Sequence, residues 1–129
     1  MLARVATVDG VLEVDLETEE VEPSLGEVEP QRVATGLPRV VAAAAAGSTI
    51  VAVVDSRPPV LVSHDAGGTW RESGRGLPPG FAVAVWQDDP DVVLFAGRNR
   101  LYLSRDGARF WHPLAVELSD ILAVGFAPG

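Results

Sequence analysis

An eight-residue motif that occurs twice in this chain constrains the fold more than any other feature. The first copy is Ser63–Trp70, and the second, weaker copy begins 41 residues further on, as Ser104–Trp111. The Ser, Asp and Trp keep their spacing in both copies, whereas the glycine lies one place closer to the Asp in the second. Self-similarity at a fixed period is typical of repeat folds, so we expect a chain of repeated units.

The residue types of the motif predict a tight turn between two strands. Ser63 and Asp65 have short polar side chains that can hydrogen-bond backbone N–H groups within a turn. Gly67 and Gly68 can adopt a positive φ without a Cβ penalty. Trp70 is expected to begin the next strand and to pack its large ring between neighbouring units. The matching residues of the second copy are Ser104, Asp106, Gly107 and Trp111.

The pattern Ser-x-Asp-x-Gly-x-Thr-Trp resembles the Asp-box of the BNR repeats in sialidase-like and sortilin-like β-propellers. The resemblance covers the repeat pattern along most of the chain. It implies that each motif lies on the turn between the third and fourth strands of a four-stranded blade, away from the catalytic face. Asp65 and Asp106 are therefore expected to be structural rather than catalytic or metal-binding.

Short strand patterns at regular spacing, separated by turn residues, indicate an all-β fold, and with the resemblance they predict a β-propeller of four-stranded antiparallel blades. The expected strands are 2–9, 11–16, 49–55, 60–63, 69–72, 81–86, 92–96, 100–104, 110–114 and 121–126. Residues 39–46 are rich in alanine and could also form a short helix, because Ala is the best helix former. We expect a strand there, since the corresponding residues of the other units have strand composition.

We expect a single propeller-forming domain over residues 1–129, with three blades. The chain opens on what corresponds to the second strand of a blade and closes on what corresponds to a first strand. The C-terminal strand is therefore expected to complete the N-terminal blade. The expected blades are 2–35 with 120–127, then 36–75, and then 76–118.

Three blades are fewer than the 4–8 that typically close a propeller, and an unclosed stack would leave bare strand edges. We therefore predict a homo-oligomer, most simply a twofold-symmetric dimer of six blades, because cyclic dimers are the commonest symmetric assemblies. In it, the final strand of each chain would pair with the first blade of the partner. A trimer of nine blades, a fragment of a longer propeller and an open sandwich are the alternatives.

The composition limits the partners and the compartment. The net charge is −8, which argues against non-specific nucleic-acid binding, because that binding depends on neutralising phosphates. The chain has no cysteine, which excludes disulfides and thiol chemistry. No signal peptide and no membrane span are apparent, so we expect a cytoplasmic protein without membrane contacts. The acidic stretch Glu13–Glu29 is expected to be a solvated edge, or alternatively a docking site for a cation or a basic partner.

The catalytic apparatus of sialidases is not expected here. Their arginine triad and Tyr–Glu pair have no counterpart, and Tyr102 lies within a predicted strand as a packing residue. The cluster Asp88–Asp91 has the composition of a turn, and His64 and His112 lack the paired spacing of a zinc site. No nucleophile elbow or phosphate loop is present. No cofactor or metal is therefore expected.

One rim of the predicted propeller carries several arginines that could bind an anionic ligand. The loops between second and third strands, and between blades, share this rim. It would hold Asp9, Arg57, Arg75, Arg98, Asn99 and Arg100. Arginine side chains bind carboxylates and phosphates bidentately. Alternatively, these arginines only balance neighbouring acidic side chains.

Three functions follow from these features. The first is a non-catalytic scaffold that binds a protein partner or an anionic ligand, or that assembles with itself. The second is a glycoside hydrolase or lyase whose site forms across the oligomer, which requires two carboxylates facing across a cleft. The third is a carbohydrate-binding module that uses exposed Trp86 or Trp111.

Overall fold

The computed structural model describes residues 1–128, which form an all-β structure. The strands are β1 (Leu2–Thr7), β2 (Gly10–Asp15), β3 (Val21–Pro23), β4 (Val40–Ala46), β5 (Thr49–Val54), β6 (Val60–Ser63), β7 (Arg71–Ser73), β8 (Ala82–Val85), β9 (Val93–Ala96), β10 (Leu101–Ser104), β11 (His112–Pro113) and β12 (Ile121–Phe126). No helix in this part of the chain is long and apolar enough to cross a membrane.

The strands form three four-stranded antiparallel sheets. The first sheet has the order β12-β1-β2-β3, the second β4-β5-β6-β7 and the third β8-β9-β10-β11. The alanine-rich segment is the strand β4, as expected, and it pairs with β5 along its length. The outermost strands β7 and β11 begin one residue after Trp70 and Trp111. Both tryptophans therefore precede strands in which we expected them to lie, over 69–72 and 110–114.

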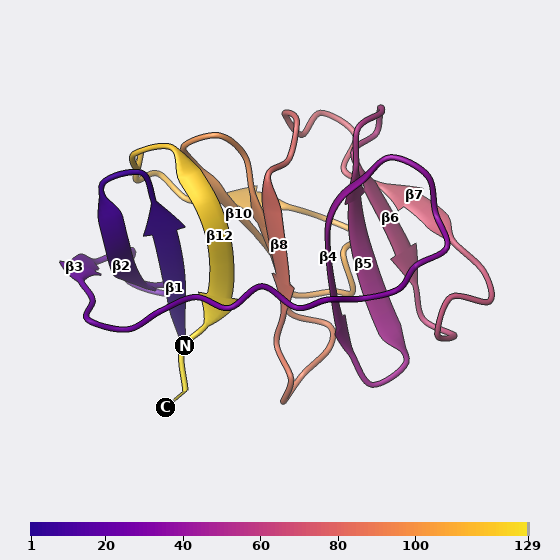
Figure 1. Ribbon diagram of the computed structural model, residues 1–129, viewed down its shortest axis with the longest axis horizontal. Helices are drawn as coiled ribbons and strands as arrows, with labels where there is room; N and C mark the ends of the chain where they lie inside the picture. The colour runs from indigo at the N-terminus through magenta and orange to yellow at the C-terminus, as the bar shows by residue number, and fades with distance from the viewer. Residues whose placement is uncertain (129) are drawn as a thin grey trace.

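The third sheet lies between the other two. Its innermost strand β8 contacts both β12 of the first sheet and β4 of the second. Figure 1 shows these three strands side by side, with the outer strands of the first and second sheets at opposite ends of the molecule. Sheets that fan out from neighbouring inner strands in this way are typical of propeller blades.

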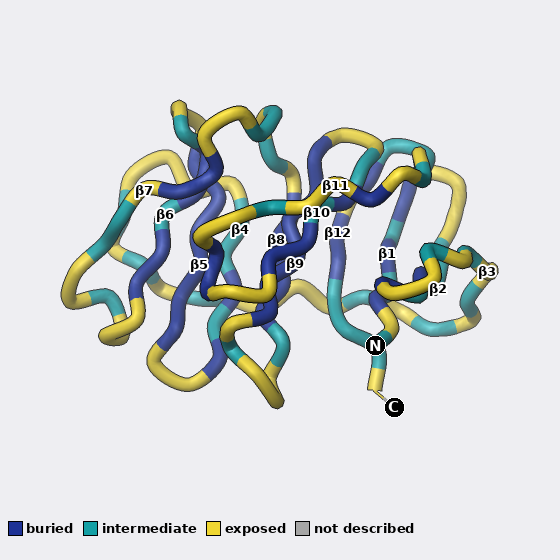
Figure 2. The backbone as a smooth tube through the Cα atoms, turned by 180° about the vertical axis from the view of Figure 1, so that it is seen from behind, coloured by how far each residue is buried: buried dark blue, intermediate teal, exposed yellow. Residues whose placement is uncertain are grey.

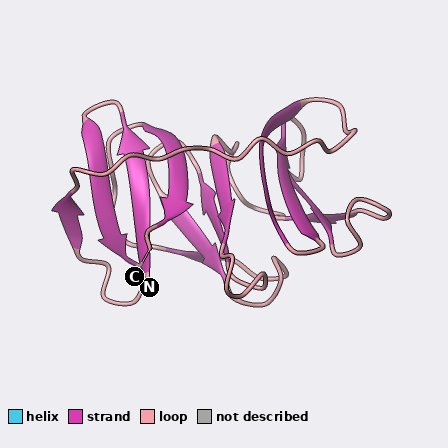
Figure 3. Cartoon of the chain, turned by 60° about the horizontal axis from the view of Figure 1, so that its bottom comes forward, coloured by secondary structure: helices cyan, strands magenta, loops and turns pink. Residues whose placement is uncertain are grey.

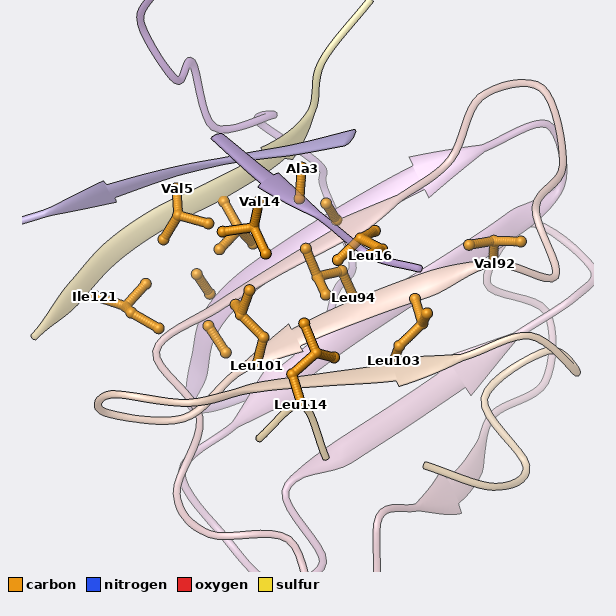
Figure 4. Close-up of a cluster of buried hydrophobic side chains, with 14 residues drawn as sticks. Ala3, Val5, Val14, Leu16, Val92, Leu94, Leu101, Leu103, Leu114 and Ile121 are labelled. Carbon is orange, nitrogen blue, oxygen red and sulfur yellow. The ribbon is translucent and has the colours of Figure 1, made fainter. Parts of the chain in front are cut away.

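The central position of the third sheet explains its composition. Every residue of β8 and β9 is buried, as Figure 2 shows in dark blue. Along β9, Val93 and Phe95 pack toward the second sheet, whereas Leu94 and Ala96 pack toward the first. Because successive side chains point to opposite faces, a strand covered on both faces is apolar throughout. Figure 4 shows the core between the first and third sheets.

The last strand completes the first sheet. β12 pairs with β1 of the same chain, with Val5 opposite Val124 and Ala6 opposite Ala123. The expected pairing of the final strand with the partner's first blade is thus replaced by pairing within the chain. The two ends of the chain meet here, since Ala127 N–H donates to the Leu2 carbonyl at 2.8 Å.

Residues 24–39, called the linker below, connect the first and second sheets. β3 and β4 lie in sheets at opposite ends, so the linker crosses the inner strands from one end to the other (Figures 1 and 3). Ser24, Gly26 and Val28 are half-buried while the residues between them are exposed, and the same alternation holds at Val33 and Thr35. The linker is therefore an extended segment with one side against the protein, although it pairs in no sheet.

The linker also protects an open strand edge. Ala45, on the free edge of β4, donates its backbone N–H to Gln31 Oε1 of the linker at 2.9 Å. The Ala45 carbonyl accepts a hydrogen bond from Gln87 Nε2 at 2.8 Å. Unpaired edges of this kind invite association with other strands, and two glutamine side chains satisfy the backbone groups of Ala45 on this one.

Candidate functional site

The first motif closes the turn between β6 and β7 with its own side chains. Asp65 Oδ1 accepts hydrogen bonds from the Thr69 N–H and the Ser63 hydroxyl, and Asp65 Oδ2 accepts one from the Thr69 hydroxyl, each at 2.8 Å. The Ser63 oxygen accepts the Gly67 N–H, also at 2.8 Å. Both polar side chains are thus fully occupied within the turn.

These hydrogen bonds fix the charge state of the carboxylate. The Thr69 backbone N–H contributes most, followed by the hydroxyls of Thr69 and Ser63, and together they lower the pKa of Asp65 to about 2. Hydrogen bonds to the charged form favour that form. At neutral pH, Asp65 is therefore an anionic acceptor within its turn and has no proton to donate as a general acid.

The second motif builds the same turn between β10 and β11. Asp106 Oδ1 accepts the N–H groups of Arg109 and Phe110 at 3.1 Å and the Ser104 hydroxyl at 2.9 Å. The Ser104 oxygen accepts the Ala108 N–H at 3.0 Å. The Phe110 N–H is the largest cause that holds the pKa of Asp106 below its ordinary value, against the opposing effect of burial.

Two consecutive residues with positive φ follow the Asp in both turns. They are Ala66 (58°) and Gly67 (92°) in the first motif, and Gly107 (73°) and Ala108 (66°) in the second. Each turn therefore uses one glycine and one alanine, in opposite order, which explains why the glycine shifts by one place between the copies. The expectation for Gly68 is wrong, because Gly68 is not among the residues with positive φ.

A third turn of this kind joins β2 and β3, where the sequence lacks the Trp of the motif. Asp15 Oδ1 accepts the N–H groups of Glu17 at 2.8 Å and Thr18 at 3.1 Å. These bonds, with that of Thr18 first, lower the pKa of Asp15. The carboxylate turn thus persists at the corresponding place in the first sheet.

The two motif tryptophans have different surroundings. Trp111 packs edge-on against Phe95 with ring centroids 5.8 Å apart, and its Nε1–H donates to Ser73 Oγ of the second sheet at 3.1 Å. It therefore lies between the second and third sheets. Trp70 lies beside Gly67 and Ile50, on the face of the second sheet that points away from the third. Below, this is called the outer face of the second sheet.

The loop arginines predicted to bind an anion fall into two groups. Arg98 pairs with Asp120 at 3.2 Å, and Arg100 pairs with Glu117 at 2.9 Å. Asn99 lies between them in the β9–β10 turn and accepts the Leu118 N–H with its carbonyl oxygen. The remaining two are Arg57, in the β5–β6 turn, and Arg75, in the β7–β8 loop. Neither takes part in the three ion pairs found among residues 1–128.

Sequence patterns missed a groove on the outside of the molecule, between the outermost strands β7 and β11. The groove has a volume of about 610 Å³ and is called the outer groove below. Arg71, Arg75 and Arg109 line it, together with Tyr102 and the exposed ring of Phe110. Arg71 and Arg109 are far apart in the sequence and meet only because the second and third sheets pack together. Arg71 follows Trp70 directly and Arg109 precedes Trp111 by two residues, so the two have no common place in the motif that could have linked them.

Other carboxylates and aromatic rings have local partners. In the β8–β9 turn, Asp89 Oδ1 accepts the Asp91 N–H at 3.1 Å. Residues 1–128 contain no group of three or more His, Cys, Asp or Glu side chains arranged to hold a metal ion. Trp86 packs against Phe126 with ring centroids 6.2 Å apart, and both rings line a cleft of about 540 Å³ beneath Glu29 of the linker.

The comparisons with known proteins concern the fold. No family model matches the sequence, and no curated protein matches it. Among solved structures, the chain is similar to a GH74 enzyme of Niastella koreensis, with a TM-score of 0.52 and 21% sequence identity. The match covers 93% of this chain but only 18% of that enzyme. GH74 is a β-propeller family, so this likeness and the three four-stranded sheets establish a β-propeller-like, all-β fold.

Proposed function

We propose that this protein is a non-catalytic scaffold of Asp-box propeller blades, which binds an anionic ligand and assembles with a second copy into a six-bladed ring. The observation that carries the proposal is the pairing of β12 with β1, because the last strand of the chain completes the first sheet. A sheet built from both ends of a chain can be built equally well from the ends of two chains. Such exchange of an identical element is a low-cost route to dimers.

The course of the linker supports the exchange. In the single chain, residues 24–39 must cross all three inner strands, because β3 and β4 belong to sheets at opposite ends. In the exchanged dimer, β12 of one copy makes the same pairs with β1 of the other. The linker then joins two neighbouring blades, so it no longer has to cross the open side.

The outer face of the second sheet supports a further blade beside it. Ile50, Ala52 and Val54 point to this face and are buried, although Ile50 and Val54 are slightly more exposed than Val51 and Val53 on the other side of β5. Val33 and Thr35 of the linker are half-buried along the segment that passes this sheet. In the ring, the first blade of the partner takes the place of the linker and covers the same apolar side chains.

The contact between the second and third sheets supports the proposal as a pattern for the contact with such a blade. There, the Ser73 hydroxyl of β7 donates to the Ala108 carbonyl of the second motif, and Trp111 donates to the Ser73 oxygen. The first motif has the same turn, and Trp70 lies beside it on the outer face. The outermost strand β3 of a second copy would occupy the place that β7 has beside Trp111.

We propose no catalytic role because the motif carboxylates serve their own turns. Asp65 and Asp106 already accept the hydrogen bonds that close their turns. Glycosidic hydrolysis needs a carboxylic acid that donates a proton and a second carboxylate across the substrate. A carboxylate whose pKa is held low by its own turn is unsuited to the first of these roles.

The test uses the lack of cysteine in the chain. In the double variant Ala6→Cys/Ala123→Cys, the two thiols face each other across β1 and β12, within reach of a disulfide. After oxidation, a denaturing gel without reductant should show two chains joined covalently, and light scattering should give the mass of two wild-type chains. The single variant Ala6→Cys is the control and should not form this band. A one-chain band together with a one-chain mass would overturn the exchange.

A further inference from the structure

The outer groove concentrates positive charge in an acidic protein. The chain has a net charge of −8, yet three of its ten basic residues line this one groove, and Glu72 is the only carboxylate there. Among residues 1–128, the ion pairs involve Arg4, Arg98 and Arg100 and none of the groove arginines. Local charge of one sign in a concave site attracts ligands of the other sign.

The backbone holds the groove arginines in place. Arg71 Nη2 donates to the Gly107 carbonyl at 2.6 Å, which ties this side chain to the second motif. Arg109 donates its backbone N–H to Asp106 Oδ1, so its position is fixed by the same turn. Arg75 lies between two glycines of positive φ in the β7–β8 loop, and it also lines the groove. A guanidinium has five N–H donors, so the hydrogen bond of Arg71 leaves donors for a ligand.

The groove also has an aromatic wall. Phe95 packs edge-on against Tyr102 and Trp111, with ring centroids 5.8 Å apart in both pairs. The Trp111 hydrogen bond to Ser73 fixes the indole plane further. Phe110 is 70% exposed at the groove, next to Arg109. The exposed ring of Phe110, beside Tyr102 and Trp111, therefore offers a surface against which a flat apolar group of a ligand can pack.

We infer that the outer groove binds a small anion that carries a flat apolar group, such as an aryl phosphate or an aryl carboxylate. The arginines bind the phosphate or carboxylate oxygens bidentately, and the aromatic wall contacts the attached ring. This inference rests on the binding part of the proposed function. Of the arginines predicted for the loop rim, it keeps only Arg75, which also lines the groove. It does not depend on ring closure, because the second and third sheets of one chain form the groove.

Calorimetric titration with phenyl phosphate tests the inference, with inorganic phosphate and phenol as the two halves of the probe. We expect phenyl phosphate to bind at least about tenfold more tightly than either half, because both parts of the groove contribute. Arg109→Ala should weaken binding by about tenfold or more, as expected for the loss of one charge-assisted hydrogen bond. Arg32→Ala is the matched control, since Arg32 is an exposed arginine of the linker that lies outside both the groove and the loop rim, and it should leave binding unchanged.

The outcomes separate the groove from the rim. Loss of binding in Arg98→Ala, at the loop rim, but not in Arg109→Ala would overturn the groove and retain the rim predicted from the sequence. Equal binding of inorganic phosphate and phenyl phosphate would overturn the aromatic part of the inference. No binding of any probe would overturn both anion sites, while the disulfide gel would still report ring assembly. Urea unfolding of the wild type and of each variant checks that every variant is folded.

Discussion

The two motif turns have the same internal hydrogen bonds and differ in what lies beside them. The first, Ser63–Trp70, matches the motif better, yet it faces outward at the end of the three-sheet stack. The second, Ser104–Trp111, has a displaced glycine, yet it is wedged between two sheets, with Ala108 fully buried. The motif therefore determines the geometry of the turn, whereas the neighbouring sheet determines how much the turn contributes to stability.

The largest expected difference is between the two tryptophans. Trp111→Ala removes a ring that packs on Phe95 and a hydrogen bond to Ser73, so the free energy of unfolding should fall by about 3–5 kcal/mol. In the single chain, Trp70→Ala removes a ring from the outer face, and the loss should be about 1–2 kcal/mol. In the proposed ring the first blade of the partner would cover this face, and the loss should be larger. Urea unfolding followed by circular dichroism measures both values.

A conservative variant separates packing from hydrogen bonding. Trp111→Phe keeps an aromatic ring but loses the Nε1–H donor, and it should lose less than Trp111→Ala. Equal losses for Trp111→Ala and Trp70→Ala would contradict the comparison, and they would mean that both rings are packed to the same extent in solution. A larger loss for Trp70→Ala that depends on protein concentration would instead point to burial of the outer face by a second copy.

The second expected difference concerns acid. The folded pKa of Asp65 is about 2, below its ordinary value of about 3.9, so this group contributes stability that is present above about pH 4 and is lost as the pH falls toward 2. Asp65→Asn removes the titrating group, so its stability should depend less on pH across this window than that of the wild type. Urea midpoints measured between pH 5 and pH 2 give the comparison. The result would be contradicted if the two curves stayed parallel.

Asp106→Asn is the matched variant for the second turn. The pKa of Asp106 is also lowered, mainly by the Phe110 hydrogen bond, and the opposing effect of burial comes second there, whereas for Asp65 it comes after three hydrogen bonds. We therefore expect a change in the same direction and of smaller size. NMR titration of the two carboxyl groups in the wild type would check the order directly, with Asp65 titrating at the lower pH.

The repeat pattern allowed most strands to be predicted, because period, turn residues and apolar alternation can be read directly from the sequence. The short strand β3 (Val21–Pro23) was missed, because it lies in the acidic stretch and has no apolar alternation. The alanine-rich strand β4 was predicted from its counterparts, against its own helix propensity. The outer groove was not predicted, because Arg71 and Arg109 meet only through the packing of two sheets. The path of the linker was also missed, since its alternation between half-buried and exposed residues carries no strong apolar signal.

The smallest expected difference is between Ala66 and Ala108, which have nearly the same strained backbone. Their φ values are 58° and 66°, a region that costs a residue with a Cβ about 1 kcal/mol. Ala66 is exposed, so Ala66→Gly should relieve this strain without loss of packing. Glycine also gives the unfolded chain more freedom, which offsets part of the gain, so the free energy of unfolding should rise by about 0.5 kcal/mol.

Ala108→Gly relieves the same strain but removes a methyl group that is fully buried in the core between the second and third sheets. Burial of one such group contributes about 0.8 kcal/mol, so the two effects should cancel or leave the variant slightly less stable. Urea unfolding at one pH resolves the sign of both changes. Equal stabilisation by both substitutions would mean that Ala108 is not packed between the sheets. The two turns would then not differ in their packing.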